Sequence, residues 1–231
     1  MKMLATREPF AAAAFLIALS AAAQAASLTV VDVAAPAINC VFNTSCTVTV
    51  TDHVSDIPMP NNITGKARLQ SRTDTGAPGS PAAGKTGYQY RVDMTQAVAI
   101  GDSACVTDLE VDFGPVSKLQ YNNSGPLDDV FVVTHGGLGK IGLVSATETN
   151  NIITFSFSQP VCAGDAPGKG VTSFFFGLAS THAPKSVTAH VAVPGLLPSD
   201  TPVPAQAPNH GIEKPLHLAP LNLHEIGRAH V

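Results

Sequence analysis

The stretch Tyr88-Gln-Tyr-Arg-Val-Asp-Met94 alternates strictly between large apolar and polar side chains. Successive side chains of a β-strand point to opposite faces of the sheet, so the pattern predicts a strand with its apolar face on a core. Gly65-Lys-Ala-Arg-Leu-Gln-Ser-Arg72 repeats the pattern, with Ala67 and Leu69 on the face opposite its basic side chains. These two stretches decide the fold class, because a helix would place the apolar residues three or four apart.

The same period of two runs through residues 26–193. Clusters of Gly, Pro and Asn separate the strand-like segments, and no capped helical pattern of ten or more residues occurs after residue 25. We therefore predict an all-β fold, an antiparallel β-sandwich that is either Ig-like or jelly-roll. The other expected strands are Leu28–Val33, Cys46–Thr51, Val106–Phe113, Val130–Thr134, Ile152–Phe157, Ser173–Gly177 and Ser186–Val193.

Residues 1–25 have the features of a secretory signal peptide. Lys2 and Arg7 precede an apolar stretch of Ala, Leu and Ile, and Ala23-Gln-Ala25 matches a small-residue cleavage site. The alternative is an uncleaved membrane anchor, but the apolar run is short for a spanning helix, and no later stretch is long and apolar enough to cross a bilayer. We expect a secreted, periplasmic or cell-surface protein.

The chain has four cysteines, which allow three disulfide pairings. Cys40–Cys46 would close a short loop, and Cys105–Cys162 would join two distant strands. We favour this pairing, because Cys40 and Cys46 enclose only Val41-Phe-Asn-Thr-Ser45 and can close a tight loop. Disulfides persist outside the cytoplasm, where we expect this protein. A metal site is the alternative, but the sequence contains no C-x-x-C pair.

After residue 193 the composition changes. Prolines recur through residues 194–225, and since proline cannot donate a ladder hydrogen bond we expect an extended, disordered tail there. The final Ile226-Gly-Arg-Ala-His-Val231 matches the translation of a common sequencing adapter, and we interpret it as an artefact of read-through.

The formal net charge of −4 argues against a nucleic-acid partner, because no cluster of Lys and Arg is available to neutralise phosphates. A protein or glycan ligand is the expectation. The sequence contains no Trp and three Tyr, so an aromatic platform for sugars would be small.

Gly137-x-Gly139-x-x-Gly142 resembles a dinucleotide-binding fingerprint. That site needs a helix directly after the glycines. The segment that follows Gly142 is only nine residues long before the next predicted strand, and it is too rich in β-branched and turn-forming residues to form that helix. We interpret the glycines as a hairpin or bulged turn and expect no nucleotide cofactor. Gly164-Asp-Ala-Pro-Gly168 with Lys169 similarly fails the spacing of a phosphate-binding loop.

Charged residues form two rows at strand spacing. Asp108, Glu110 and Asp112 share one face of a predicted strand. We expect them to pair with a basic row as an exposed polar face, although a ligand-binding face is the alternative. The basic row consists of Lys66, Arg68, Arg72 and Arg91.

Asp128 and Asp129 are candidate calcium ligands. Calcium needs six to eight oxygens, and no D-x-D-x-D-G loop supplies them here, so the prediction is a weak one. Calcium is the single cofactor that we consider.

Catalytic motifs are sparse. Neither Gly-x-Ser-x-Gly nor Ser-x-x-Lys occurs, and among His53, His135, His182 and His190 the first is the most site-like, since Asp52 and Asp56 lie near it in sequence. The function we expect is an exported binding or structural module without enzymatic activity. The alternative is a secreted hydrolase whose catalytic site is assembled from loops.

Overall fold

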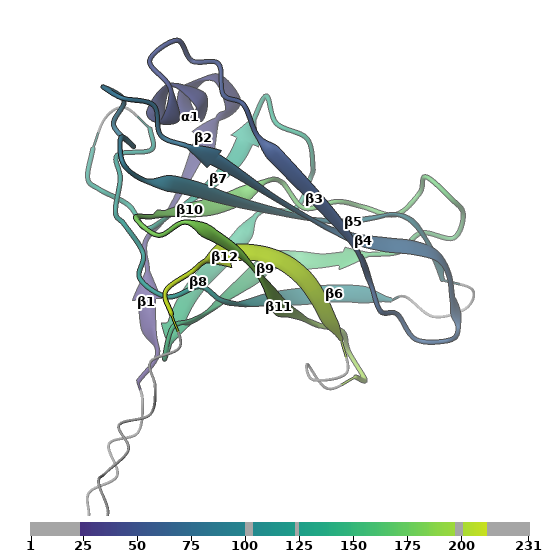
Figure 1. Cartoon of the computed structure of the whole chain (residues 1–231). Coiled ribbons are helices and arrows are strands. Elements are labelled where there is room, and N and C mark those ends of the chain that lie inside the picture. Colours follow the sequence, from purple (N-terminus) through teal and green to yellow (C-terminus); the bar gives the residue numbers. More distant parts are fainter. Residues whose placement is uncertain (1–23, 100–103, 123–124, 197–200, 212–231) are drawn as a thin grey trace, which may run out of the picture.

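The computed structural model describes residues 24–99, 104–122, 125–196 and 201–211. Two six-stranded sheets pack face to face, and one short helix lies over the outer face of one of them (Figure 1). The elements are β1 (Ala26–Leu28), β2 (Val30–Ala34), α1 (Ala35–Phe42), β3 (Thr51–Ile57), β4 (Ile63–Thr75), β5 (Thr86–Ala99), β6 (Cys105–Asp112), β7 (Val130–His135), β8 (Leu143–Thr149), β9 (Ile152–Cys162), β10 (Phe176–Ser180), β11 (Pro184–Ala192) and β12 (Pro202–Pro208).

The strand order defines the two sheets. Sheet 1 has the order β1-β8-β9-β6-β11-β12, and sheet 2 has the order β2-β7-β10-β5-β4-β3. Adjacent strands run antiparallel except β2 and β7, which are parallel. The predicted all-β sandwich is confirmed, with a single parallel strand pair among those described.

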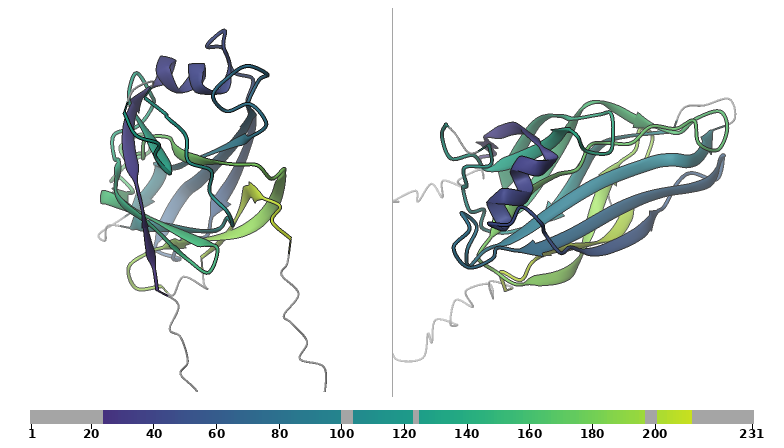
Figure 2. Two further views of the ribbon diagram at one scale, coloured as in Figure 1. Left: turned by 90° about the vertical axis from the view of Figure 1, so that its left-hand side faces the viewer. Right: turned by 90° about the horizontal axis from the view of Figure 1, so that it is seen from above.

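The N-terminal segment links the sheets along one side. β1 pairs with β8 of sheet 1 and β2 pairs with β7 of sheet 2, so the chain changes sheets at Thr29 (Figure 2). Asp129 holds this crossing. One of its carboxylate oxygens accepts hydrogen bonds from the backbone N–H and the hydroxyl of Thr29, both at 2.9 Å.

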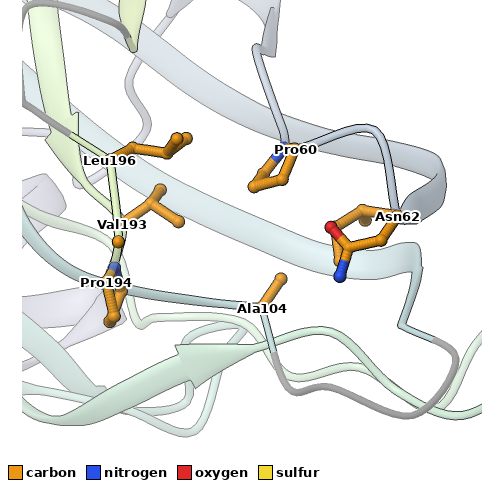
Figure 3. Close-up of a pocket in the computed structure, with 8 residues that line it drawn as sticks. Pro60, Asn62, Ala104, Val193, Pro194 and Leu196 are labelled. Carbon is orange, nitrogen blue, oxygen red and sulfur yellow. The ribbon is translucent and has the colours of Figure 1, made fainter.

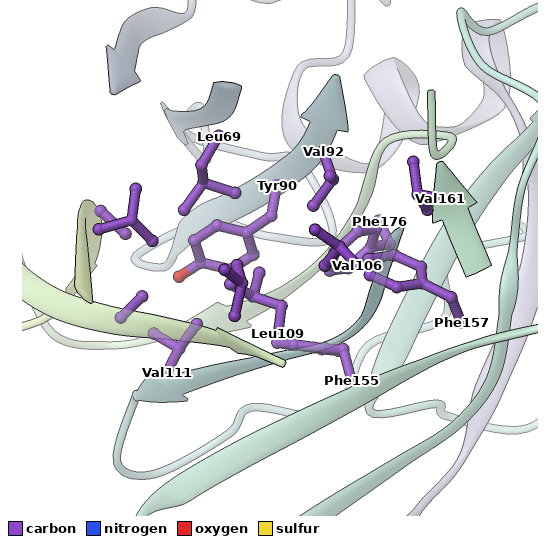
Figure 4. Close-up of a cluster of buried hydrophobic side chains, with 14 of the residues drawn as sticks. Leu69, Tyr90, Val92, Val106, Leu109, Val111, Phe155, Phe157, Val161 and Phe176 are labelled. Atoms are coloured by element: carbon purple, nitrogen blue, oxygen red, sulfur yellow. The ribbon is translucent and has the colours of Figure 1, made fainter. Parts of the chain in front are cut away.

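The main core fills the space between the sheets. The inner face of β5 contributes Tyr88, Tyr90, Val92 and Met94, all fully buried, as the alternation of the quoted stretch predicts. Their aromatic neighbours come from both sheets (Figure 4). The ring centroids of Tyr90 and Phe155 are 5.9 Å apart. This interlocking of rings across two sheets defines the register of the sandwich.

A second, smaller cluster lies on the outer face of sheet 2, beneath α1. We call it the outer cluster, and its buried members are Val33, Ile38, Val41, Phe42, Ala82, Leu119, Tyr121, Phe131, Val133, Phe175 and Ala179. Helix α1 is eight residues long and has a proline in its first turn, where the missing N–H has no consequence. So short a helix gives little periodic signal, which explains why the sequence pattern does not reveal it.

Both disulfides join the cysteines that the sequence spacing favours. Cys40–Cys46 ties the end of α1 to the following loop, and Cys105–Cys162 joins directly opposed residues of β6 and β9. Cys46 has a φ of 57°, and the strand expected from Cys46 begins only at Thr51. That part of the prediction is wrong, because the disulfide holds the segment against the helix.

The expectation of a disordered tail is wrong for Pro202–Pro208. This segment forms β12, which pairs antiparallel with β11 at the edge of sheet 1. Pro202, Pro204 and Gln206 alternate with the buried residues Val203, Ala205 and Ala207, so the segment has the strand period of two. An edge strand tolerates proline because one row of its N–H groups needs no partner. The sandwich therefore extends beyond residue 193, whereas the predicted signal peptide and adapter-derived terminus lie outside the described residues apart from Gln24 and Ala25.

Candidate functional site

The outer face of sheet 2 is divided into a covered half and an open half. The outer cluster covers β2, β7 and β10, and charged side chains occupy β3 and β4. On the open half Asp56 pairs with Lys66 at 2.6 Å and with Arg68 at 3.7 Å, and the hydrogen bond from Lys66 lowers the pKa of Asp56. Ion pairs this exposed contribute little stability, so the open half is mainly a solvated surface.

The basic and acidic rows do not meet as expected. Lys66, Arg68 and Arg72 lie on β4 of sheet 2, whereas the acidic row lies on β6 of sheet 1. The basic side chains instead pair with aspartates of the neighbouring strand β3, and Asp112 pairs with His210 at 2.9 Å. Cross-strand ion pairs on a polar face are therefore present, as predicted. The predicted pairing of the basic row with the acidic row is wrong, because sequence alone does not show which strands are adjacent.

A pocket of about 230 Å³ lies at the border between the two halves. Its lining residues come from α1, from β4, β5 and β7, and from the segments that follow β7 and precede β10; they are Ala35, Ile38, Asn39, Arg72, Gln89, Val133, Gly136, Gly137, Leu138 and Phe175. The lining combines apolar side chains with two amides, those of Asn39 and Gln89, and the guanidinium of Arg72. We call it the border pocket.

Two arginines converge on one aromatic ring at this pocket. The guanidinium carbon of Arg72 lies 4.0 Å from the ring centroid of Phe175, and that of Arg91 lies 5.0 Å from it. Both distances are typical of cation–π contacts. The ring therefore fixes the position of two cationic groups that like-charge repulsion would otherwise separate.

Phe175 is the site residue that sequence reasoning assigned only to a core. It belongs to Ser173-Phe-Phe-Phe-Gly177, and the structure places Phe176 in the main core but Phe175 in the outer cluster. Consecutive residues of an extended segment face opposite ways, so three successive phenylalanines cannot share one core. That alternation was the available signal. The backbone N–H of Val133 donates to the Phe175 carbonyl at 2.8 Å and holds the segment beside β7.

The glycine-rich segment forms one wall of the border pocket. It connects β7 to β8, with strand rather than helix following the glycines, which is the turn that the sequence predicts. Gly139 has a φ of 124°, and a Cβ there would lie 2.2 Å from the Ser173 carbonyl oxygen. Glycine is required for so close an approach. Lys140 donates its backbone N–H to the Thr172 carbonyl at 3.0 Å, so the loop is held in place.

Leu138 is presented to solvent by this held loop. It lines the border pocket, yet 67% of its surface is exposed. A large apolar side chain held in water at the rim of a pocket gains by contact with an apolar ligand.

Asp74 is buried and is joined to the pocket through the lining residue Gln89. It accepts a hydrogen bond from the Gln89 amide at 3.2 Å, and its second carboxylate oxygen is buried without a hydrogen-bond partner. Burial raises the pKa of Asp74 to about 6, although the Gln89 bond and the charge of Arg72 act in the opposite direction. Gln89 thus connects a pocket-lining amide to a carboxyl group that titrates near neutral pH.

The guanidinium of Arg91 has only part of its hydrogen-bonding capacity occupied. Its Nε is buried without a hydrogen-bond partner, and its nearest carboxylate, that of Asp93, is 3.6 Å from Nη2. Arg72 is better paired, since its Nε and Nη2 lie 2.9 Å and 3.4 Å from the two carboxylate oxygens of Asp52.

A second pocket, of about 340 Å³, lies at one end of the sandwich (Figure 3). Figure 3 shows Pro60 and Asn62 on one side, with Val193 and Leu196 on the other. Its lining carries one polar side chain, Asn62, and no charged group. It offers less chemical specificity than the border pocket.

Asp128 and Asp129, the calcium candidates, are both buried. Asp129 also accepts a hydrogen bond from Lys118 at 2.8 Å. Burial tends to raise the pKa of Asp129, but the bonds from Lys118 and Thr29 outweigh it, so the pKa lies below its usual value. In the described part of the chain, no three potential ligands among His, Cys, Asp and Glu gather closely enough to hold a metal. Asp129 is thus engaged in fastening the sheet crossing.

Within the described ranges, neither His53 nor His182 forms part of a catalytic arrangement. His53 is exposed on β3, and strand alternation turns it away from Asp52 and Asp56. His182 Nδ1 lies 3.3 Å from the Ser180 hydroxyl, but Ser180 is fully buried and also donates to the Pro115 carbonyl. Because the Ser180 hydroxyl is buried and bonded to a backbone carbonyl, we interpret it as a structural group.

Comparison with protein-family models, curated proteins and solved structures found no match to this chain. Among the described residues, no helix has the length and apolar character needed to cross a membrane. The proposed function therefore rests on the geometry of the border pocket.

Proposed function

We propose that the chain is an exported binding module and that it takes its ligand in the border pocket. The observation that carries this proposal is the pocket itself: two arginines fixed on Phe175, beside an exposed Leu138 on a held loop. Rigid placement of a few polar groups against an apolar wall is the common plan of small-ligand sites.

Export is supported by the two disulfides, which persist in oxidising compartments, and by the signal-like residues 1–25. Expression of the full chain in a bacterium with cell fractionation and N-terminal mass spectrometry tests this part. We expect extracytoplasmic protein beginning at Ala26. Cytoplasmic protein that retains Lys2 and Arg7 would contradict export.

Binding can be tested with methyl-labelled protein, because Leu138 reports on the pocket. A nuclear magnetic resonance screen of neutral sugars, amides and carboxylates should find a class that shifts the Leu138 and Val133 methyl signals saturably. The methyl signals of Leu127, another leucine exposed at 57%, should stay in place and serve as the control. If no class shifts the pocket signals, the proposed site is wrong.

A further inference from the structure

From the distribution of polar and apolar groups in the border pocket, we infer that its ligand is a small monocarboxylate with an apolar body. This inference rests on the proposed function and adds the chemical class of the ligand. Its basis is that Arg72 lines the same pocket as the apolar side chains of Ile38, Val133 and Leu138.

Arg72 has hydrogen-bonding capacity beyond its ion pair. Asp52 engages Nε and one N–H of Nη2, which leaves the two N–H groups of Nη1 outside that interaction. A planar guanidinium matches the geometry of a carboxylate, and a hydrogen bond between charged groups is stronger than one between neutral groups. The Arg72 side chain is 23% exposed, so the group is accessible yet partly shielded from water.

The surrounding charges disfavour an anion of high charge. Arg91 adds a second positive group above the same ring, but Asp52 and Asp93 each lie against one of the two arginines, and the carboxyl group of Asp74 accepts a hydrogen bond from the pocket-lining Gln89. Neighbouring carboxylates therefore offset the charge of the arginines, and a multiply charged anion such as phosphate would be repelled by them. One negative charge, recognised mainly through hydrogen bonds, fits this arrangement.

The size and lining of the pocket define the rest of the ligand. A volume of about 230 Å³ is below the range typical of drug-sized ligands, so the occupant is small. Burying a short hydrocarbon chain against Leu138 and Val133 removes apolar surface from water and is therefore favourable. Asn39 and Gln89 also line the pocket, and the Asn39 amide and the N–H of Gln89 that does not bond Asp74 can complete the hydrogen bonding of a carboxylate.

The test compares hexanoate with hexanamide, which has the same shape without the charge, and with acetate, which lacks the apolar body. Titration of the Leu138 methyl signals gives the dissociation constants. We expect hexanoate to bind at least tenfold more tightly than either of the other two. Equal binding of hexanoate and hexanamide would overturn the carboxylate inference and leave the proposed pocket standing, whereas saturable shifts from none of the screened classes would remove the pocket itself.

Two pairs of matched variants locate the interaction. Arg72→Gln should abolish the preference for hexanoate over hexanamide, and Arg68→Gln, on the same face of the same strand, should retain it. Leu138→Ala should weaken hexanoate binding severalfold, and Leu127→Ala should not, with the affinities of both variants read from the Val133 methyl signals because Leu138→Ala lacks the Leu138 methyl groups. Since Leu138 is mostly exposed, its replacement leaves folding intact and keeps the test valid if Arg72→Gln fails to fold. An unchanged preference in Arg72→Gln, or unchanged affinity in Leu138→Ala, would refute the inference.

Discussion

The two faces of β5 show how differently two regions of this molecule are built. The inner face presents Tyr88 and Tyr90 to a main core that both sheets contribute to, whereas the outer face presents Gln89 and Arg91 to the border pocket region. The main core consists almost wholly of apolar groups. The outer region mixes apolar side chains with buried polar atoms that lack partners, on Asp74 and Arg91.

The difference suggests that the main core provides the stability of the fold and that the outer region provides the groups for ligand binding. Burial of large rings between two sheets gives a large favourable free energy, and close packing makes the region intolerant of change. Unpartnered polar groups cost free energy, and proteins commonly retain such groups where a ligand is bound. We therefore expect changes in the main core to affect global unfolding and changes in the outer region to affect the pocket.

The largest effect is expected from Phe155→Ala. Its ring lies 5.0 Å from that of Phe176 and 5.9 Å from that of Tyr90, so truncation leaves a cavity in the centre of the main core. The free energy of unfolding should fall by about 4 kcal/mol. Denaturant unfolding followed by circular dichroism measures this, with Val144→Ala on the exposed surface as the control. A loss below about 1 kcal/mol would show that the main core is not the stabilising region.

We expect the two disulfides to differ in how much they contribute to the free energy of unfolding. Replacing Cys105 and Cys162 by alanine opens a loop of 57 residues in sheet 1 and should cost about 4 kcal/mol of unfolding free energy. Replacing Cys40 and Cys46, which are six residues apart, should cost about 2 kcal/mol. Hydrogen exchange should then accelerate in α1 in the second variant while β6 and β9 stay protected. Equal losses from the two variants would contradict the comparison.

Sequence reasoning was most successful where one face of a strand is buried. Alternation along Tyr88–Met94 and Gly65–Arg72 predicted the inner and outer faces correctly, because the period of two is a direct consequence of strand geometry. The Pro-rich segment around Val203 was misjudged for the opposite reason. The prediction of disorder gave more weight to the proline content of this segment than to its alternating pattern, although an edge strand can accommodate prolines.

The border pocket could be predicted only in part. Arg72 and Arg91 were recognised as members of a basic row, but their convergence on Phe175 depends on the pairing of β4, β5 and β10. The same dependence explains why the acidic row of β6 was assigned the wrong partners. Strand adjacency is a long-range property that local patterns do not encode.

Asp74 is the next test of the outer region. Its pKa is about 6 in the folded protein against an ordinary value of 3.8, so the folded state binds the proton more tightly. The stability that this group contributes is present below pH 3.8 and is lost as the pH rises through about 6. Asp74→Asn removes the buried charge and should raise the free energy of unfolding near pH 7.5 by up to about 3 kcal/mol.

The gain from Asp74→Asn should disappear near about pH 4, where the native carboxyl is already protonated. Unfolding curves at the two pH values provide the measurement. Asp56→Asn is the control, because the hydrogen bond from Lys66 lowers the pKa of Asp56 and its removal should give no gain at neutral pH. If Asp74→Asn is no more stable than the parent at about pH 7.5, burial does not disfavour the charge of Asp74.

The smallest effect is expected from Tyr90→Phe, which keeps the ring in the main core and removes one hydroxyl. That hydroxyl donates to the Gln206 carbonyl of β12 at 2.7 Å, so it connects sheet 2 to the edge strand that the sequence did not predict. Loss of one such bond should lower the free energy of unfolding by about 1 kcal/mol and accelerate hydrogen exchange in β12. Tyr88→Phe is the matched control, since its hydroxyl donates to the His182 carbonyl outside β12. If both variants accelerate exchange in β12 equally, the strand is held by general packing of the core and not by Tyr90. A selective effect of Tyr90→Phe would instead show that a single polar contact within an apolar core fixes the last strand of the sandwich.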